Sequence, residues 1–213
     1  YNSVKTVRIG LEEGALLSCS DGYTDKKPIV FYGSSITQGG CASRPGNSYQ
    51  ALISRRFNID YFNFGFSGNA LGEKTMADYI AALPMSLFFL DFDHNSPNAE
   101  HLKAHHESFF LNIREKNPDL PVIMATKTDI PRSPAAEKSN AAHRAVVYET
   151  YENAVKRGDR NVIFIDGATV FSKALTLSAP ADSCTVDGCH PNDLGFACMA
   201  KVFGDAIEKM LGL

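Results

Sequence analysis

The stretch that decides the fold is IVFYGSSITQGG at residues 29–40, in which an apolar run passes directly into small and polar residues. Short apolar runs rich in β-branched and aromatic side chains are typical of strands buried on both faces of a parallel sheet. Glycine and serine are typical of a tight turn after such a strand. We therefore expect residues 29–32 to form a buried strand and Ser35 to lie on the turn that follows it.

Four more apolar runs follow this stretch, and helical patterns separate them. The runs are YFNF at residues 61–64, LFFL at 87–90, VIMA at 122–125 and VIFI at 162–165. A helical pattern from Leu102 to Ile113 stops at Asn117, because the following proline disfavours a helical conformation there. Residues 140–155 and 194–210 have helical patterns as well.

Strands that alternate with helices predict βαβ units. We expect a three-layer α/β/α sandwich around a doubly wound, mainly parallel sheet of five strands, of the flavodoxin-like kind. In such sheets the reactive groups lie at the carboxyl ends of the strands.

The first 27 residues do not follow this rhythm. Residues 4–9 alternate between apolar and polar side chains, which predicts a half-exposed strand. We interpret residues 1–27 as an N-terminal extension, the remnant of a lost β-rich domain, and residues 28–213 as the catalytic domain. Because the sequence begins at Tyr1, without a Met or a visible signal peptide, we expect it to be a fragment or a processed form of a soluble protein, and the compartment, cytoplasmic or secreted, stays open.

The amino-acid composition indicates one globular domain and argues against two classes of protein, those that bind nucleic acid and those that span a membrane. The chain has 213 residues, 44% of them hydrophobic, which suits one globular domain. A net charge of −3 without a basic cluster indicates no nucleic-acid partner. The apolar runs are much shorter than the roughly 20 residues that span a bilayer, so no membrane span is expected. Oligomeric state stays open.

The cysteines indicate neither a disulfide framework nor a zinc site. Their number is odd, and no Cys-x-x-Cys pair occurs. Reduced thiols are the simplest interpretation, although Cys184 and Cys189 are close enough in sequence for a bridge. The cysteines are Cys19, Cys41, Cys184, Cys189 and Cys198.

The segment GSSITQGG at residues 33–40 can present a nucleophile. A serine at a strand-to-helix turn can project its hydroxyl above the edge of the sheet. The Gly-x-Ser-x-Gly elbow of α/β-hydrolases is absent, since Thr37 stands where its second glycine would be. A phosphate-binding P-loop is absent too, because no Gly-Lys-Ser/Thr follows. Taken alone, the segment is more typical of an ordinary turn, because small polar residues are common in any turn.

The segment DGCH at residues 187–190 can supply a general base and its orienting carboxylate. Asp187 and His190 are three residues apart, so the carboxylate can hold one imidazole nitrogen while the other faces outward. The alternative is a helix N-cap formed by Asn192 or Asp193 beside an incidental surface histidine.

Two further loops can donate hydrogen bonds to developing negative charge. Gly68 lies in NFGFSGN after the second run and could present its backbone N–H, and Asn95 lies in DFDHNS after the third run and could present its amide. Taken alone, each loop is more typical of an ordinary polar connection between elements. The Asp-x-Asp-x-Asn pattern lacks the glycine and glutamate of an EF-hand, so no calcium is expected there.

Together these four segments resemble the SGNH hydrolases, also called the GDSL-type esterase family. The serine block matches at residues 33–37, with Ser34 in place of the usual aspartate, and the glycine block matches at Gly68. The asparagine block keeps Asn95 but lacks the rest of Gly-x-Asn-Asp, and the Asp-x-x-His block matches fully at residues 187–190. The resemblance runs from about residue 27 to the C-terminus.

The resemblance implies a complete serine-hydrolase site. Ser35 would be the nucleophile, His190 the base and Asp187 the residue that orients it. The backbone N–H groups of Ser35 and Gly68 and the side chain of Asn95 would form the oxyanion hole. Neither a metal nor an organic cofactor would be required.

Relatives with a similar serine block and a β-rich N-terminal domain look like carbohydrate esterases. The resemblance thus implies hydrolysis of short acyl groups, above all acetyl, from a small-molecule or oligosaccharide ester. An acyltransferase, and a lysophospholipase or thioesterase, remain alternatives with the same triad. A catalytically silent carbohydrate-binding domain is a further alternative.

The remaining polar candidates are weaker. His94 adjoins Asn95 and is a candidate for substrate binding. Arg44, in the loop after the nucleophile, could bind substrate or fix that loop. Four other histidines fall on predicted helices and fit a solvated or core-edge position: His101, His105, His106 and His143.

Overall fold

A single sheet of five parallel strands runs through the middle of the molecule. The computed structural model describes residues 4–24, 26–175 and 180–213. The strand order is β2-β1-β3-β4-β5, so the predicted sheet is confirmed and is wholly parallel. The strands are β1 (Ile29–Gly33), β2 (Tyr61–Gly65), β3 (Leu87–Asp91), β4 (Val122–Ala125) and β5 (Val162–Ile165).

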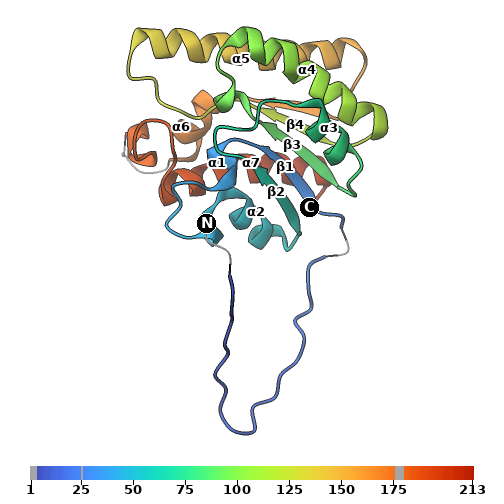
Figure 1. The fold of residues 1–213 in the computed structure, drawn as a ribbon, viewed down its shortest axis with the longest axis vertical. Coiled ribbons are helices and arrows are strands. Elements are labelled where there is room, and N and C mark those ends of the chain that lie inside the picture. Colours follow the sequence, from blue (N-terminus) through green and yellow to red (C-terminus); the bar gives the residue numbers. More distant parts are fainter. Residues whose placement is uncertain (1–3, 25, 176–179) are drawn as a thin grey trace.

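Helices cover both faces of the sheet and give the predicted three layers (Figure 1). One apolar core lies between the sheet and α2, α6 and α7, and a second lies between the sheet and α3, α4 and α5. The helices are α1 (Ser35–Gln38), α2 (Tyr49–Phe57), α3 (Lys74–Ala81), α4 (Ala99–Lys116), α5 (Pro134–Lys156), α6 (Val170–Ala174) and α7 (Asp193–Leu211). Among the described residues, no helix is both long and apolar enough to cross a membrane.

One predicted helix end agrees with the structure, and one predicted start does not. α4 ends at Lys116 with Asn117 as its C-cap, as the following proline indicates. α5 begins at Pro134, six residues before the predicted start at residue 140. Ser133 caps it, with its side chain accepting a hydrogen bond from the N–H of Ala136, and proline is favourable at a first helical position.

The prediction that every strand is buried on both faces is wrong for β2. Phe62 is 36% exposed, and Asn63 is exposed as well. β2 is one of the two edge strands of the sheet and pairs only with β1, so helices do not enclose it as they enclose β1 and β3. An apolar run does not reveal where its strand will lie in the sheet.

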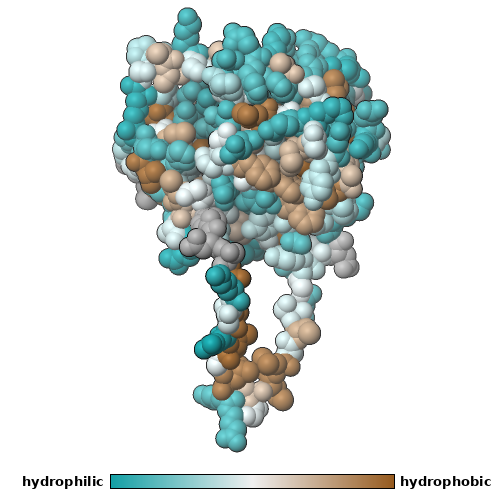
Figure 2. All heavy atoms as spheres, in the orientation of Figure 1, coloured by the Kyte–Doolittle hydropathy of each residue, from teal (hydrophilic) through white to brown (hydrophobic). Residues whose placement is uncertain are grey.

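The predicted strand at residues 4–9 is also absent, since the described residues 4–24 contain no strand. They form an arm that projects from the body, and its apolar side chains lie in the open (Figures 1 and 2). Val4, Val7 and Ile9 are 77%, 75% and 74% exposed. An alternating pattern becomes a strand only where another strand supplies backbone partners.

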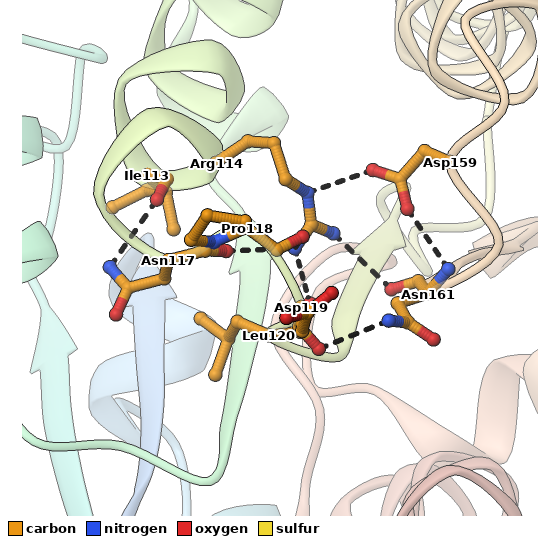
Figure 3. A network of polar contacts seen from close by, with 8 residues as sticks. All are labelled: Ile113, Arg114, Asn117, Pro118, Asp119, Leu120, Asp159 and Asn161. Atoms are coloured by element: carbon orange, nitrogen blue, oxygen red, sulfur yellow. Dashed lines mark hydrogen bonds and ion pairs between the residues drawn. The ribbon is translucent and has the colours of Figure 1, made fainter.

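A polar network closes the amino-terminal ends of β4 and β5 (Figure 3). The guanidinium of Arg114 donates to Asp159 over 2.8 Å and to the carbonyl oxygens of Asn117, Pro118 and Leu120 over 3.0, 3.0 and 2.7 Å. The side chains of Arg114 and Asp159 are each only 15% exposed. The network thus joins the end of α4 to the two strand starts, opposite the edge that carries the candidate site.

We expect Arg114→Ala to lower the free energy of unfolding by about 3 kcal/mol, because it leaves a largely buried carboxylate and three carbonyl groups without their donor. Urea unfolding measures the change. Arg157→Ala is the matched control: its partner is Glu107 at 2.7 Å, but its side chain is 45% exposed, so less than about 1 kcal/mol is expected. Equal losses in both variants would contradict the structural role of Arg114.

Candidate active site

The nucleophile candidate lies where β1 passes into α1. Ser34 is the N-cap of α1, and its side chain accepts a hydrogen bond from the N–H of Ile36 at 3.2 Å. Ser34 is fully buried, whereas Ser35 is partly exposed. The position of the family aspartate is therefore occupied by a helix cap, and Ser35 is the serine whose hydroxyl can meet a substrate.

Two glycines allow α1 to pack this closely against the sheet. A Cβ on Gly65, the last residue of β2, would lie 2.0 Å from the backbone nitrogen of Gln38. A Cβ on Gly33 would lie 2.1 Å from Oγ1 of Thr37, a residue of α1. Side chains at either position would push the nucleophile turn away from the strand ends.

Ser35, His190 and Asp187 form a continuous hydrogen-bonded set. Ser35 Oγ lies 3.0 Å from His190 Nε2, and His190 Nδ1 lies 2.7 Å from Asp187 Oδ2. Because an ionised carboxylate only accepts, Nδ1 carries the proton in this pairing and Nε2 is left as the acceptor. The imidazole is thus oriented to take a proton from the serine hydroxyl.

The loop before α7 holds the carboxylate in place. The other oxygen of Asp187 accepts the backbone N–H groups of His190 at 2.7 Å and Cys189 at 2.9 Å. These bonds, first those from His190, hold the pKa of Asp187 well below its usual range. Asp187 therefore stays anionic throughout the acidic range in which imidazoles gain a proton.

The two loops of the expected oxyanion hole are tied to one another and to the nucleophile turn. Asn95 Nδ2 donates to the carbonyl oxygen of Phe66 at 2.8 Å, and the N–H of Ser67 donates to Gln38 Oε1 at 3.2 Å. Gly68 has a φ of +69°, a backbone conformation that favours glycine. An amide has two N–H donors, so the bond to Phe66 leaves Asn95 a second one.

A residue that the sequence pattern assigned only to helix capping fixes the loop after the nucleophile. Asp193 accepts hydrogen bonds from the N–H of Ser43 at 2.8 Å, from Ser43 Oγ at 2.6 Å and from Asn47 Nδ2 at 2.9 Å. The helix cap is instead Asn192, whose side chain accepts the N–H of Gly195. Arg44 is exposed beside Asp193, and Asp193 holds the loop that carries it.

The histidines divide between the site and the core. His94 is partly buried, with Nδ1 3.8 Å from Cys189 Sγ, and burial, together with nearby Lys127 and His190, places its pKa well below the usual range. His106 is buried against Thr150 at 2.9 Å, and burial lowers its pKa to about 3. His143 is likewise buried in α5.

The structure has no Cys184–Cys189 bridge. All five cysteines are free, and the thiol nearest to Cys184 is Cys198, at 4.0 Å. Burial raises the pKa of Cys184 to about 12 and that of Cys189 to about 11, so neither thiol competes with Ser35 as a nucleophile at neutral pH.

A parallel α/β sandwich with a Ser-His-Asp set at the carboxyl edge of its sheet is an architecture of serine hydrolases. The model of the GDSL-like lipase/acylhydrolase family matches residues 26–208. The chain therefore belongs to this family, whose members are ester hydrolases. A search of curated proteins found no match.

Solved structures share the fold. A protein described as a GDSL-like lipase from Bacteroides ovatus is 33% identical over 88% of this chain, with a TM-score of 0.77. The salicylyl-acyltransferase SsfX3 from a tetracycline biosynthetic pathway is 24% identical over 93%, with a TM-score of 0.72. This chain spans only 54% and 58% of those two chains. A mutant of an acetyl-xylooligosaccharide esterase from Geobacillus is 19% identical over 90% of this chain and 96% of its own, with a TM-score of 0.63.

Proposed function

We propose that this chain is a serine esterase that removes short acyl groups, above all acetyl, from a carbohydrate through an acyl-enzyme on Ser35. The observation that carries the proposal is the hydrogen-bonded set at 3.0 Å between Ser35 Oγ and His190 Nε2 and 2.7 Å between His190 Nδ1 and Asp187. Its atoms have the order and spacing that base-assisted attack by a serine requires.

The mechanism follows from this spacing. His190 Nε2 takes the hydroxyl proton as Ser35 Oγ attacks the ester carbonyl, while Asp187 stabilises the imidazolium. His190 then returns the proton to the leaving alcohol, and Ser35 keeps the acyl group. Water repeats the sequence on the acyl-enzyme, releases the carboxylic acid and restores the hydroxyl.

The negative charge that develops on the carbonyl oxygen would rest on three donors. They are the backbone N–H groups of Ser35 and Gly68 and the side chain of Asn95. Ser35 is the first residue of α1, so its N–H has no intrahelical partner. The bond from Asn95 to Phe66 supports the proposal because it holds the glycine and asparagine loops in one arrangement.

We expect Asn95→Ala to lower kcat by about 10²–10³-fold with little change in KM, the usual effect of losing one oxyanion donor. Steady-state kinetics on p-nitrophenyl acetate measure both constants. Asn98→Ala is the matched control, since Asn98 is the exposed N-cap of α4 and should affect stability alone, by about 1 kcal/mol. A rise in KM alone for Asn95→Ala would make Asn95 a substrate-binding residue instead.

The surroundings of the site suit an ester whose alcohol part is polar. A cavity of about 240 Å³ lies beyond the carboxyl ends of β4 and β5, lined by hydrogen-bonding side chains that include Glu137, Arg144 and Asp166. Such groups are suited to the hydroxyls of a sugar. The fold shared with an acetyl-xylooligosaccharide esterase supports the same substrate class.

The preference for a short acyl group can be measured directly. We expect p-nitrophenyl acetate to be hydrolysed well above butyrate, octanoate to be nearly inert, and acetate to be released from an acetylated xylo-oligosaccharide. One added methylene on the acyl group changes the free energy that separates two substrates by only about 1–3 kcal/mol, even in a fitted pocket. A strict preference for acetyl therefore requires steric closure around the acyl methyl. Rates that rise with chain length would favour a lipid or thioester substrate and leave the Ser35 mechanism intact.

An acyltransferase uses the same acyl-enzyme, and the shared fold with SsfX3 makes this the second candidate. Products formed in the presence of an added sugar alcohol distinguish the two activities. Free acetate as the main product supports the hydrolase, and an acylated acceptor as the main product supports the transferase.

A further inference from the structure

Three side chains with metal-binding atoms meet beside the triad, each from a different loop. His94 lies in a short 3₁₀ helix after β3 (Asp93–Asn95), Asp129 follows β4, and Cys189 lies before α7. Their candidate ligand atoms all lie within 4.8 Å of one another, and His94 Nδ1 is 3.8 Å from Cys189 Sγ. Within the described part of the chain, this is the single group of three such residues.

One of these atoms has no hydrogen-bond partner. Asp129 Oδ1 is buried, and among the described residues nothing donates to it. A buried carboxylate oxygen without a donor is costly and needs an explanation. The other oxygen of Asp129 is directed by Asn140 Nδ2 at 3.2 Å, as the second oxygen of a metal-binding carboxylate commonly is. A cation at this point would satisfy Oδ1.

The three loops are held together by bonds next to each candidate ligand. The N–H of Ile130 donates to the carbonyl oxygen of Gly188 at 2.7 Å, which joins the loop of Asp129 to that of Cys189. The N–H of Lys127 donates to Asp93 at 3.0 Å, which joins the loop of Asp129 to that of His94. The three loops are therefore already held in place, and few of their residues would have to become ordered when an ion binds.

We propose that His94, Asp129 and Cys189 bind one Zn²⁺ ion, with the fourth coordination position open to solvent. An imidazole nitrogen, a carboxylate oxygen and a thiolate are ligands that zinc accepts together, whereas calcium and magnesium require oxygen ligands. On binding, Cys189 releases its thiol proton to solvent. His94 is then a ligand rather than a contact for substrate. The site does not depend on the proposed esterase activity.

Cysteine spacing did not indicate this site, because its ligands are far apart in sequence. The three positions come from loops 35 and 60 residues apart along the chain, as their numbers show. Only one of the five cysteines takes part, so no Cys-x-x-Cys pair is needed.

Zinc binding is tested on the full, chelator-treated chain with its cysteines kept reduced. Calorimetric titration with Zn²⁺ should give one ion per chain. Titration with Co²⁺ should give the thiolate-to-cobalt charge-transfer absorption that only a cysteine ligand produces. Binding without that absorption, or no binding to the folded chain, would overturn the proposal.

Variants locate the ion. Cys189→Ser and His94→Ala should each weaken zinc binding by at least about 100-fold, because each removes a ligand. Asn140→Ala should weaken it by about 10-fold, because Asn140 only orients the carboxylate of Asp129. Cys41→Ser is the matched thiol control and should leave affinity unchanged. Melting temperatures without metal check that each variant is folded.

A pair of neighbouring histidines in α4 offers a further test of where the ion binds. His101 and His105 lie one turn apart in α4, with ring centroids 4.2 Å apart, so they are the alternative place for a zinc ion. We expect His105→Ala to keep the stoichiometric binding. Loss of binding in His105→Ala together with retention in Cys189→Ser would assign the ion to α4 and refute the proposed site.

Discussion

Ser35→Ala should abolish hydrolysis, with a fall in kcat of about 10⁶-fold, and should end labelling by a fluorophosphonate probe. Loss of the attacking oxygen removes the covalent route itself, so only the weak catalysis that binding and oxyanion donors supply can remain. Ester hydrolysis and probe labelling of the purified variant are the measurements.

Ser34→Ala is the matched control, one residue away. Ser34 is fully buried and caps α1, so its loss should cost about 1 kcal/mol of stability and leave the nucleophile in place. Labelling that persists in Ser35→Ala but disappears in Ser34→Ala would move the nucleophile to Ser34. A wild-type chain that is folded yet never labelled would favour a silent carbohydrate-binding domain.

Asp187→Asn should lower kcat by about 10⁴-fold while the chain stays folded. The asparagine oxygen can still accept the backbone N–H groups of Cys189 and His190. Its amide nitrogen cannot accept the imidazole proton, so His190 is left in the tautomer whose Nε2 carries a proton and cannot act as the base. Asp182→Asn, at an exposed position five residues upstream, is the matched control and should keep full activity.

The pH dependence of the hydrolysis rate tests the assignment of His190 as the general base and Asp187 as the carboxylate that orients it. Hydrogen bonds keep the pKa of Asp187 well below its usual range, so this carboxylate remains ionised while imidazoles gain a proton. Catalysis needs His190 unprotonated, and the rate should therefore fall as the pH drops below neutral. A rate that stays constant from about pH 8 down to about pH 5 would contradict a histidine base.

Local sequence was sufficient for the five strands and for the candidate nucleophile, base and orienter. An apolar run is a property of neighbouring residues, and parallel strands all end at one edge, so loops that follow successive strands must approach one another. Residues 187–190 precede α7 and follow no strand, so the resemblance of all four segments to the SGNH family, and not strand order, paired them with Ser35 across more than 150 positions. Strand order did place Gly68 and Asn95 at that edge, because they follow the second and third strands.

Tertiary structure alone decided the features that depend on partners distant in sequence. It placed β2 at the edge of the sheet, left residues 4–9 without a strand partner, and made Asp193 the anchor of the loop after Ser35. It also brought His94, Asp129 and Cys189 together. A pattern of side chains records which residues avoid water, but not which backbone pairs with which or which polar groups meet. Those are set only when the loops close around the finished sheet.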